Sequence, residues 1–315
     1  MILSEDMYVP NLRWRQGEYQ ALMRLDDRTK EKIMPLICIP EVEFDFELWQ
    51  PKKTVHEHVF PFVARYEKKW GSRPAWISLS EEVAVGRMDD GSHVFDYIFD
   101  GLRLNNAHAI PALPLACDPD TLTAASRVNV TDGHGVALQI RLEDLMVGSP
   151  LRKVAQTAET LGVDFDEIDL IIDLRAPNFE PYAAFSTALI AAFRRLGDLS
   201  VFRNFVLVST AIPESLKDIA KGSDRIPRHD WLFFQAFLSA LPSGMRRPIF
   251  GDYTIVHPEF TAMDMRMIKA AGKIVYTTAD TWATRKGGAF RDNPGQMHSH
   301  CDAIVNEADF DFRGA

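Results

Sequence analysis

The stretch VALQIRLEDLMVGSPLRKVAQTAETLGVDFDEIDLIIDL, residues 136–174, decides the fold because it contains one complete strand–helix–strand unit. Two short apolar runs, Val136–Leu142 and Asp169–Leu174, have the length and composition of buried strands. Between them, Leu151–Leu161 carries apolar residues at helical spacing, follows a Ser-Pro helix start and stops at Gly162. Strands that alternate with helices in this way predict a parallel sheet covered by helices.

The same alternation recurs along the whole chain. Short apolar runs bounded by Pro, Gly or polar residues are followed by longer segments with helical spacing. The remaining predicted strands, which bring the set to eight, are Tyr8–Trp14, Pro35–Pro40, Ala75–Leu79, Ile110–Ala116, Phe205–Ser209 and Ile249–Val256. The remaining predicted helices are Glu18–Leu25, Val55–Trp70, Val94–Leu104, Pro119–Val128, Tyr182–Leu196, a turn around Glu214–Ala220, His229–Leu241 and Thr261–Ala271.

Chain length leaves two architectures open. A chain of 315 residues accommodates two domains of about 150 residues or one α/β barrel of about 250. No Pro/Gly/Ser-rich linker divides the chain, and no glycine-rich phosphate loop follows a predicted strand. We therefore predict a single (β/α)8 TIM-like barrel over residues 1–272. Residues 273–315 are predicted to add a β-hairpin, a helix and a tail that pack on the barrel within the same domain, because KIVYT (273–277) and the following TADTWATRKGGAF have the pattern of two paired strands.

Composition excludes several classes of protein. The hydrophobic share of 46% and the charged share of 25% are typical of a globular protein. The net charge of −9 argues against broad nucleic-acid binding, which needs a surplus of Lys and Arg. No apolar run approaches the ~18 residues of a membrane span, and the acidic start lacks a secretory signal pattern, so we expect a cytoplasmic protein. Three cysteines without paired spacing indicate neither a disulfide framework nor a metal site.

Polar residues at the ends of the predicted strands are the candidate site residues, because barrels of this type bind ligands at the C-terminal ends of their strands. The candidate catalytic acids are Asp173, Glu41 and Asp252. The candidate ligand-binding residues at strand ends are Arg13, Arg141, Arg175 and Tyr253. Other polar residues at these ends are Arg15, Glu43, Ser78, Ser80, Asp118, Glu143, Ser209 and Thr210.

Asp173 is the sharpest single signal, because an Asp at the end of an apolar central strand must be hydrogen-bonded, metal-bound or catalytic. Arg141 and Arg175 end neighbouring strands, and two guanidinium groups there would hold a phosphate or carboxylate. Alternatively, Arg141 pairs with Asp173 as an ion pair of the barrel rim. A metal bound by Asp173, Glu41 and Asp252 is a further alternative, but no metal-binding motif supports it. The sequence identifies no cofactor.

Four residues near the C-terminus are further candidates for ligand binding. The hairpin that carries Trp282 would fold over the barrel mouth as a lid or cap one end of the barrel. Arg285 and Lys286 lie in TRKGG, which only loosely resembles a phosphate-binding turn, and His298 lies in the following QMHSH. A structural or surface role for His298 is the competing interpretation.

Several blocks of sequence together resemble a known family. These are YVPNLRWRQGEYQAL near the start, IMPLICIP, GDYTIVHP, and KIVYTTADTWATRKGGAF with a later GQMH. They look like the phage-type beta protein family of T-even phages and bacterial mobile elements. The resemblance covers essentially the whole chain and implies a context of phage–host conflict or antiviral defence, without an established reaction. The positions that it marks are Arg13, Gly17, Glu18, Glu41, Gly251, Asp252, Tyr253, Trp282, Gly287 and Gln296.

Two functions therefore stay open. In the first, the barrel mouth binds a phosphate-bearing or other anionic small molecule or a nucleotide, and a hydrolase or lyase reaction acts on it. In the second, the barrel is a non-catalytic scaffold in a phage-defence or phage-encoded complex, and the segments 230–241 and 44–49 contact a protein partner, although core packing also explains their aromatic residues. The sequence leaves open whether the protein is an enzyme.

Overall fold

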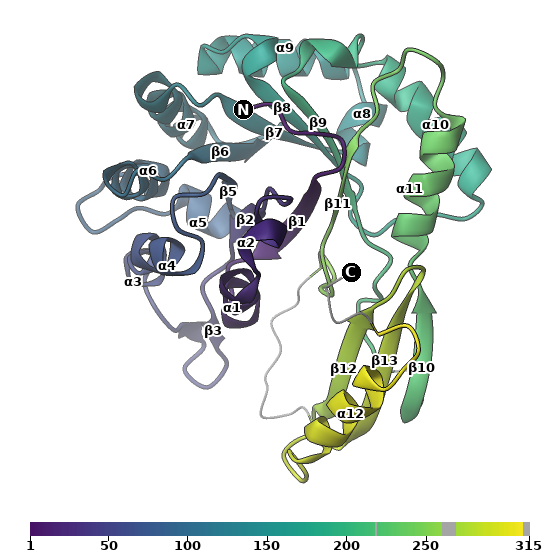
Figure 1. Ribbon diagram of the computed structural model, residues 1–315. Helices are drawn as coiled ribbons and strands as arrows, with labels where there is room; N and C mark the ends of the chain where they lie inside the picture. Colours follow the sequence, from purple (N-terminus) through teal and green to yellow (C-terminus); the bar gives the residue numbers. More distant parts are fainter. Residues whose placement is uncertain (218, 260–268, 311–315) are drawn as a thin grey trace.

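A computed structural model describes residues 1–217, 219–259 and 269–310 and contains a closed barrel of eight parallel strands (Figure 1). Around the barrel the order is β1-β11-β9-β8-β7-β6-β5-β2, and β2 pairs with β1 to close it. The predicted single barrel is confirmed, and every predicted barrel strand overlaps an observed one. The strands are β1 (Tyr8–Arg13), β2 (Leu36–Ile39), β5 (Ala75–Leu79), β6 (Ala109–Pro114), β7 (Val136–Arg141), β8 (Ile168–Asp173), β9 (Asn204–Ser209) and β11 (Ile249–Asp252).

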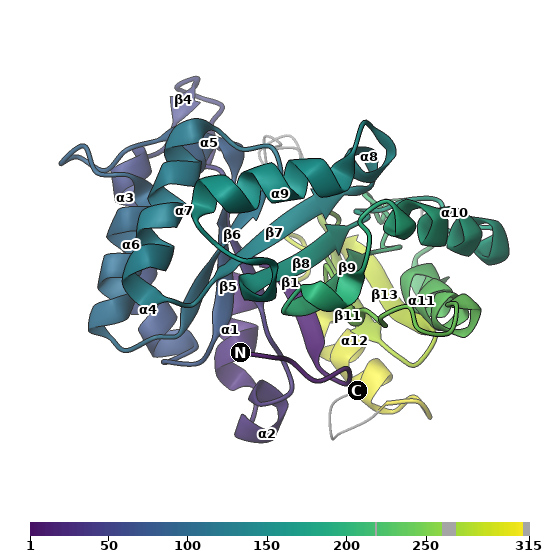
Figure 2. The same cartoon turned by 90° about the horizontal axis from the view of Figure 1, so that it is seen from above.

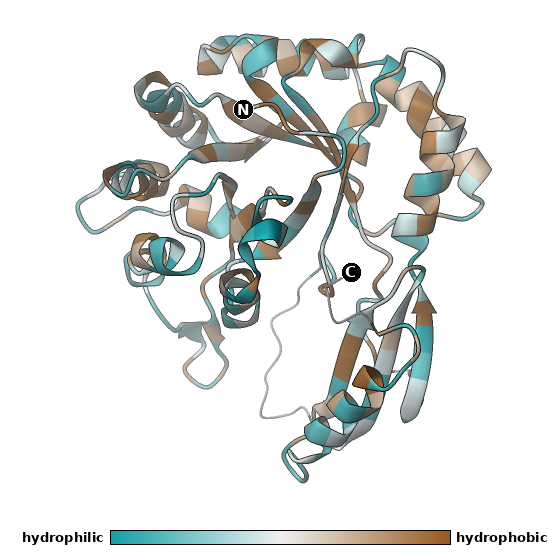
Figure 3. Ribbon diagram, viewed as in Figure 1, coloured by the Kyte–Doolittle hydropathy of each residue, from teal (hydrophilic) through white to brown (hydrophobic). Residues whose placement is uncertain are grey.

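Side chains on each barrel strand alternate between the inside of the barrel and the surrounding helices. One buried cluster, which includes Val9, Leu36, Trp76 and Ile171, fills the inside. Their neighbours along the strands belong to a second, larger cluster together with apolar residues of the helices. Both faces of the sheet are therefore buried, which explains why the strands are apolar along most of their length (Figure 3).

The outer layer consists of helices that follow the strands (Figure 2). Predicted start and stop signals act as expected: Asp118 caps α7 through the backbone N–H groups of Asp120 and Thr121, and Gly162 ends α9 with a φ of 70°. The helices around the barrel are α1 (Gln16–Arg24), α2 (Asp27–Lys30), α3 (Val55–Val59), α4 (Phe62–Lys69), α5 (Glu81–Val85), α6 (Val94–Leu104), α7 (Pro119–Asp132), α8 (Leu142–Met146), α9 (Pro150–Leu161), α10 (Tyr182–Arg194) and α11 (His229–Ala240).

Three predicted helices differ from the structure or lie outside it. The segment Val55–Trp70 forms two helices, α3 and α4, because Pro61 lacks the N–H that a continuous helix needs. The predicted turn around Glu214–Ala220 contains no helix among its described residues. Most of the predicted helix Thr261–Ala271 lies outside the described residues, and Ala271 begins a strand.

A three-stranded antiparallel sheet is added to the barrel (Figure 1). The predicted hairpin forms its strands β12 (Ala271–Thr277) and β13 (Thr281–Ala289), and α12 (Gln296–Val305) packs against them. The third strand, β10 (Gly222–Pro227), comes from the connection between β9 and α11 and was not predicted, because its residues are mostly polar. A second small addition is the hairpin of β3 (Phe44–Asp45) and β4 (Gln50–Pro51) after β2.

The N-terminal end of the barrel is closed by a buried polar network centred on Asp169. Its carboxylate accepts hydrogen bonds from Trp76 Nε1 at 2.7 Å, from Asn204 Nδ2 at 2.6 Å, and from Arg203 Nε and Nη2 at 2.7 and 2.6 Å. Asn204 in turn accepts the backbone N–H of Leu3 at 2.8 Å. This end therefore holds a fully paired carboxylate beneath the N-terminal segment, which is the arrangement that a buried charge requires.

Candidate functional site

The C-terminal mouth of the barrel is lined by polar side chains. The alternation that places Val9, Ala137 and Ile171 inside the barrel also places Arg13, Arg141 and Asp173 on the inner face, at the strand ends. By the same alternation the inner face also carries Cys38, Ser78, Gln139, Thr210 and Tyr253. Arg141 lies directly opposite Asp173 in the register of β7 and β8. The structure therefore brings four of the predicted site residues, Arg13, Arg141, Asp173 and Tyr253, to one mouth.

Asp173 forms the buried acidic centre of this mouth and is only 8% exposed. Its Oδ2 accepts the hydroxyl of Tyr253 at 2.5 Å, and its Oδ1 accepts the backbone N–H of Arg175 at 2.9 Å. Burial raises the pKa of Asp173, and these two hydrogen bonds and the nearby Arg175 and Arg141 charges oppose the rise. Burial and the Asp173 charge raise the pKa of Tyr253 well above its ordinary value. The mouth therefore contains a hydrogen-bonded pair that consists of the Asp173 carboxyl and the neutral Tyr253 phenol.

The backbone at the ends of β8 and β11 adopts an uncommon conformation. Arg175 has a φ of 58° and Thr254 a φ of 57°, in the left-handed region that residues other than glycine rarely occupy. Such strain is concentrated at functional sites, where the surrounding structure holds it in place. Arg175 lies two residues after Asp173, the last residue of β8, and Thr254 directly follows Tyr253 at the end of β11.

The three predicted arginines have different partners. Arg13 Nη2 donates to the carbonyl of Pro258 at 2.6 Å, and Arg175 Nη2 forms an ion pair with Glu259. The guanidinium of exposed Arg141 forms no ion pair and donates no hydrogen bond within residues 1–217, 219–259 and 269–310. In particular, the alternative ion pair of Arg141 with Asp173 is not formed among these residues. Arg141 is thus a cation at the mouth that the described chain does not neutralise.

A cavity of about 260 Å³ lies beside this mouth. Its walls come from the segments that follow β8, β9 and β11 and from the start of α11. One wall begins at Ala176, the residue after Arg175, and another at Thr210, whose N–H donates to the Arg175 carbonyl at 2.8 Å. The lining residues are Ala176, Pro177, Asn178, Phe179, Glu180, Thr210, Ala211, Ile212, Pro213, His229 and His257.

Asp252 does not belong to this mouth, which corrects one predicted catalytic residue. It occupies the outward position on β11, between the inward-facing Gly251 and Tyr253, so it points toward the helices. Its carboxylate accepts the hydroxyl of Tyr8 and, at 2.8 Å, the N–H of Thr254, and Arg228 Nη2 lies 3.7 Å away. Asp173 and Asp252 therefore face opposite sides of the sheet.

Near Asp252 the structure contains a further buried acid, Asp230, at the start of α11. It is fully buried, and both of its carboxylate oxygens lack a hydrogen-bond partner within the described chain. Burial, and then the charge of Asp252, raise the pKa of Asp230 to about 7. Arg228 lies between the rings of Trp231 and Trp282, at 5.8 and 5.9 Å from their centroids. This group joins the barrel, α11 and the added sheet.

Glu41, the remaining predicted acid, is exposed on the loop after β2. A different acid, Glu18, contacts the end of β1. Its Oε1 accepts the N–H of Arg13 at 3.1 Å, and burial raises its pKa to about 7. Cys38 is on β2, the strand that lies between β1 and β5 in the barrel. Burial raises the pKa of its thiol to about 11, so it is a neutral thiol at physiological pH.

The C-terminal candidates support the added sheet rather than the mouth. Trp282 is 1% exposed and packs under Arg228. Lys286 Nζ donates to the carbonyls of residues 216, 217 and 219, and Arg285 pairs with Glu307. His298 is exposed on α12. The donors of Lys286 and Arg285 are used within the added sheet and its neighbouring segments, so the structure does not place these residues at the predicted anion site.

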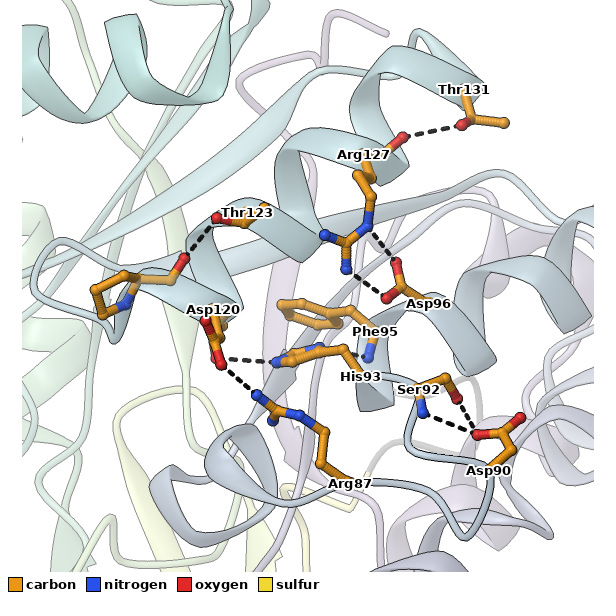
Figure 4. A network of polar contacts seen from close by, with 12 residues as sticks. Arg87, Asp90, Ser92, His93, Phe95, Asp96, Asp120, Thr123, Arg127 and Thr131 are labelled. Atoms are coloured by element: carbon orange, nitrogen blue, oxygen red, sulfur yellow. Dashed lines mark hydrogen bonds and ion pairs between the residues drawn. The ribbon is translucent and has the colours of Figure 1, made fainter.

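Polar residues of the outer helices form networks of a different kind. Figure 4 shows Arg127 of α7 paired with Asp96 of α6, and Arg87 paired with Asp120. The first pair links two neighbouring helices, the second joins the α5–α6 connection to α7, and both are largely exposed, so they add little to stability. Within the described residues, no three His, Cys, Asp or Glu side chains are close enough to share a metal ion. None of the helices described is long and apolar enough to cross a bilayer.

The two segments considered as partner surface differ from each other. In segment 230–241, Phe233, Phe234 and Phe237 are buried against the barrel and α10. In segment 44–49, Leu48 and Trp49 are 65% and 78% exposed at the tip of the β3–β4 hairpin. Core packing therefore explains the aromatic residues of the first segment and not those of the second.

The profile of the family described as Beta protein matches residues 8–315, nearly the whole chain. The chain belongs to the beta protein family. A comparison with curated proteins found no match. Among solved structures, triosephosphate isomerase from Bartonella henselae aligns with a TM-score of 0.38 and 10% sequence identity, over 80% of this chain and 92% of that chain.

Three positions that the family resemblance marks have packing roles in this beta family chain. A Cβ at Gly251 would lie 2.8 Å from the Val9 carbonyl and 2.9 Å from Val208 Cγ2, so only glycine fits inside the barrel there. A Cβ at Gly287 would lie 1.9 Å from Gln296 Oε1. Gly287 and Gln296 therefore mark the contact of α12 with β13, whereas nothing in the structure explains Gly17.

Four residues of the mouth and its cavity lie outside the predicted strand ends. They are His229 at the start of α11, and Glu180, His257 and Glu259 in loops. A signal did exist for Asp252: counting alternate residues from Ile249 would have placed it outside the barrel.

Proposed function

We propose that this beta family protein binds a small anionic ligand, such as a phosphate monoester, at the C-terminal mouth of its barrel. The observation that carries the proposal is the inward-facing Arg141, whose guanidinium is unpaired within the described chain, directly opposite the buried Asp173. An unpaired guanidinium in a barrel mouth is suited to a phosphate or carboxylate, which it can bind through two parallel hydrogen bonds. Arg175 would supply the second cation.

The size of the neighbouring cavity supports a small ligand. Its volume of about 260 Å³ is below the range of about 300–1,000 Å³ that is usual for drug-sized ligands. The walls combine the apolar residues Phe179, Ile212 and Pro213 with the polar residues Asn178 and His229. The anionic group would thus lie at the arginines, and the uncharged part of the ligand would lie in the cavity.

Asp173 is suited to proton transfer on such a ligand. Its raised pKa brings the carboxyl closer to neutral pH, where acid–base catalysis is most effective. Tyr253 and the Arg175 N–H each occupy one oxygen and fix the orientation of the carboxyl. A hydrolase or a lyase reaction would use such a group to activate water or to remove a proton from the ligand.

Binding can be tested by a thermal-shift screen of sugar phosphates, nucleotides and phenyl phosphate, followed by calorimetric titration of the best ligand. We expect Arg141→Ala to weaken binding at least about tenfold, because a charge-assisted hydrogen bond is worth about 1.5–3 kcal/mol. The matched control is Arg152→Ala, which removes another exposed arginine, from α9.

Unchanged binding in Arg152→Ala would support the proposal. Equal losses in the two variants would mean that only overall charge matters, and the absence of any shift with all anions would refute the proposal.

A further inference from the structure

One short segment crosses the mouth from β11 and contacts the ends of two other strands. In this crossing segment, residues 253–259, Tyr253 donates to Asp173, the Pro258 carbonyl accepts from Arg13, and Glu259 pairs with Arg175. Arg13 ends β1 and Asp173 ends β8, and these strands are separated by β11 and β9 in the barrel. The crossing segment therefore reaches both sides of the mouth.

Within this segment, two consecutive residues supply oxygen atoms to two of the three predicted arginines. Pro258 presents a neutral carbonyl to Arg13, whereas Glu259 presents a carboxylate to Arg175, with Nη2 and Oε1 in direct contact. The Glu259 N–H donates to His257 Nδ1 at 3.1 Å, which fixes the turn, and His257 lines the cavity. The Glu259 carboxylate thus already binds the Arg175 guanidinium, beside the cavity.

We propose that the Glu259 carboxylate is an internal competitor for the anion site at Arg175, so that an incoming anion must displace it. This inference rests on the proposed function, because it concerns the same arginine. It assigns Glu259 a regulatory role: the residue lowers the affinity of the mouth for anions and releases Arg175 only when a ligand replaces its carboxylate.

The exposure of the Glu259–Arg175 ion pair indicates how far Glu259 lowers the affinity for an anion. The Glu259 side chain is 62% exposed and that of Arg175 25% exposed, so water screens their attraction. An exposed ion pair of this kind shifts an equilibrium by up to about fivefold. A ligand with additional contacts to Arg141 and the cavity would exceed that factor, so Glu259 tunes binding without blocking it.

The experiment is a calorimetric titration of phenyl phosphate at pH 8, where its phosphoryl group is a dianion. The variants are Glu259→Ala, Arg175→Ala and the double variant, each compared with the wild-type protein. The matched control is Asp27→Ala, which removes a carboxylate of α2 that is 79% exposed and paired with Arg73 at 2.6 Å. The control reports any gain that comes only from the change in net charge.

We expect Glu259→Ala to lower the Kd by up to about fivefold, Asp27→Ala to leave it unchanged, and Glu259→Ala to have no effect when Arg175 is already Ala. Unchanged or weaker binding in Glu259→Ala would overturn this inference while the proposed function stands. An equal gain in Asp27→Ala would also overturn it. If neither the wild-type protein nor Glu259→Ala binds phenyl phosphate, the proposed function itself fails.

Discussion

Asp169 and Asp173 lie four residues apart on β8, and both face the inside of the barrel, yet their surroundings differ. Asp169 accepts hydrogen bonds from Trp76, Arg203 and Asn204 and belongs to a closed network. Asp173 accepts one from Tyr253 and one backbone N–H, and the nearby Arg141 does not pair with it. The same residue type on the same face thus belongs to a closed polar network at one end of the barrel, whereas at the other end it accepts two hydrogen bonds beside an arginine that does not pair with it.

The largest expected effect is a difference between the two aspartates in how far their substitution lowers the free energy of unfolding. Asp169→Asn should lower the free energy of unfolding by about 3–5 kcal/mol, because it leaves the buried charge of Arg203 without its partner. Asp173→Asn should change it by about 1 kcal/mol or less, since burial already disfavours the charged form of Asp173. Urea unfolding at pH 7 measures both values. Equal losses in the two variants would contradict the division of roles.

Asp230 extends the comparison to an acid with no hydrogen-bond partner in the described chain. Because its folded pKa of about 7 is higher than the ordinary 3.8, the protonated form is favoured in the folded state. Its contribution to stability is therefore present below about pH 4 and lost as the pH rises through 7. Asp230→Asn should match the wild-type protein at pH 4 and exceed it by roughly 1–4 kcal/mol at pH 8.

Urea unfolding of the wild-type protein and Asp230→Asn across this pH range measures the difference. A difference that does not depend on pH would show that Asp230 is ionised, with a cation beside it, throughout the range.

A smaller effect is expected when one hydrogen-bond donor is removed at either end of the barrel. Trp76→Phe removes the N–H that binds Asp169 and should cost about 1–3 kcal/mol of unfolding free energy. Tyr253→Phe removes the hydroxyl that binds Asp173 and should cost less, about 1 kcal/mol, because Asp173 keeps the hydrogen bond from the Arg175 N–H. Thermal unfolding of the two variants provides the comparison. A greater loss in Tyr253→Phe would indicate that the mouth is also mainly structural.

The barrel itself was predictable from the sequence. Apolar runs such as VALQIRL and DLIIDL, separated by helical segments with Pro starts and Gly ends, specify strands and helices through local physical chemistry. The hairpin of β12 and β13 was predictable for the same reason. Strand β10 was not, because its polar residues form a strand only by pairing with β13.

The site was predictable only in part. Strand-end positions led to Arg13, Arg141, Asp173 and Tyr253, which do share the mouth, but Asp252 required the two-residue alternation to be counted. Lys286 has cationic chemistry suited to phosphate, yet its three donors bind backbone carbonyls. The proposed role of Glu259 depends on its contact with Arg175. The two residues are 84 positions apart in the sequence, and no local pattern encodes such a contact.

The most direct test of the central claim is a crystal structure of the protein grown with saturating phenyl phosphate. We predict that the phosphoryl group lies within hydrogen-bonding distance of Arg141, on the same side of the barrel as Asp173, with the phenyl ring in the cavity of about 260 Å³. Ligand density at the Asp169 end, or an unliganded mouth at saturating concentration, would contradict the account.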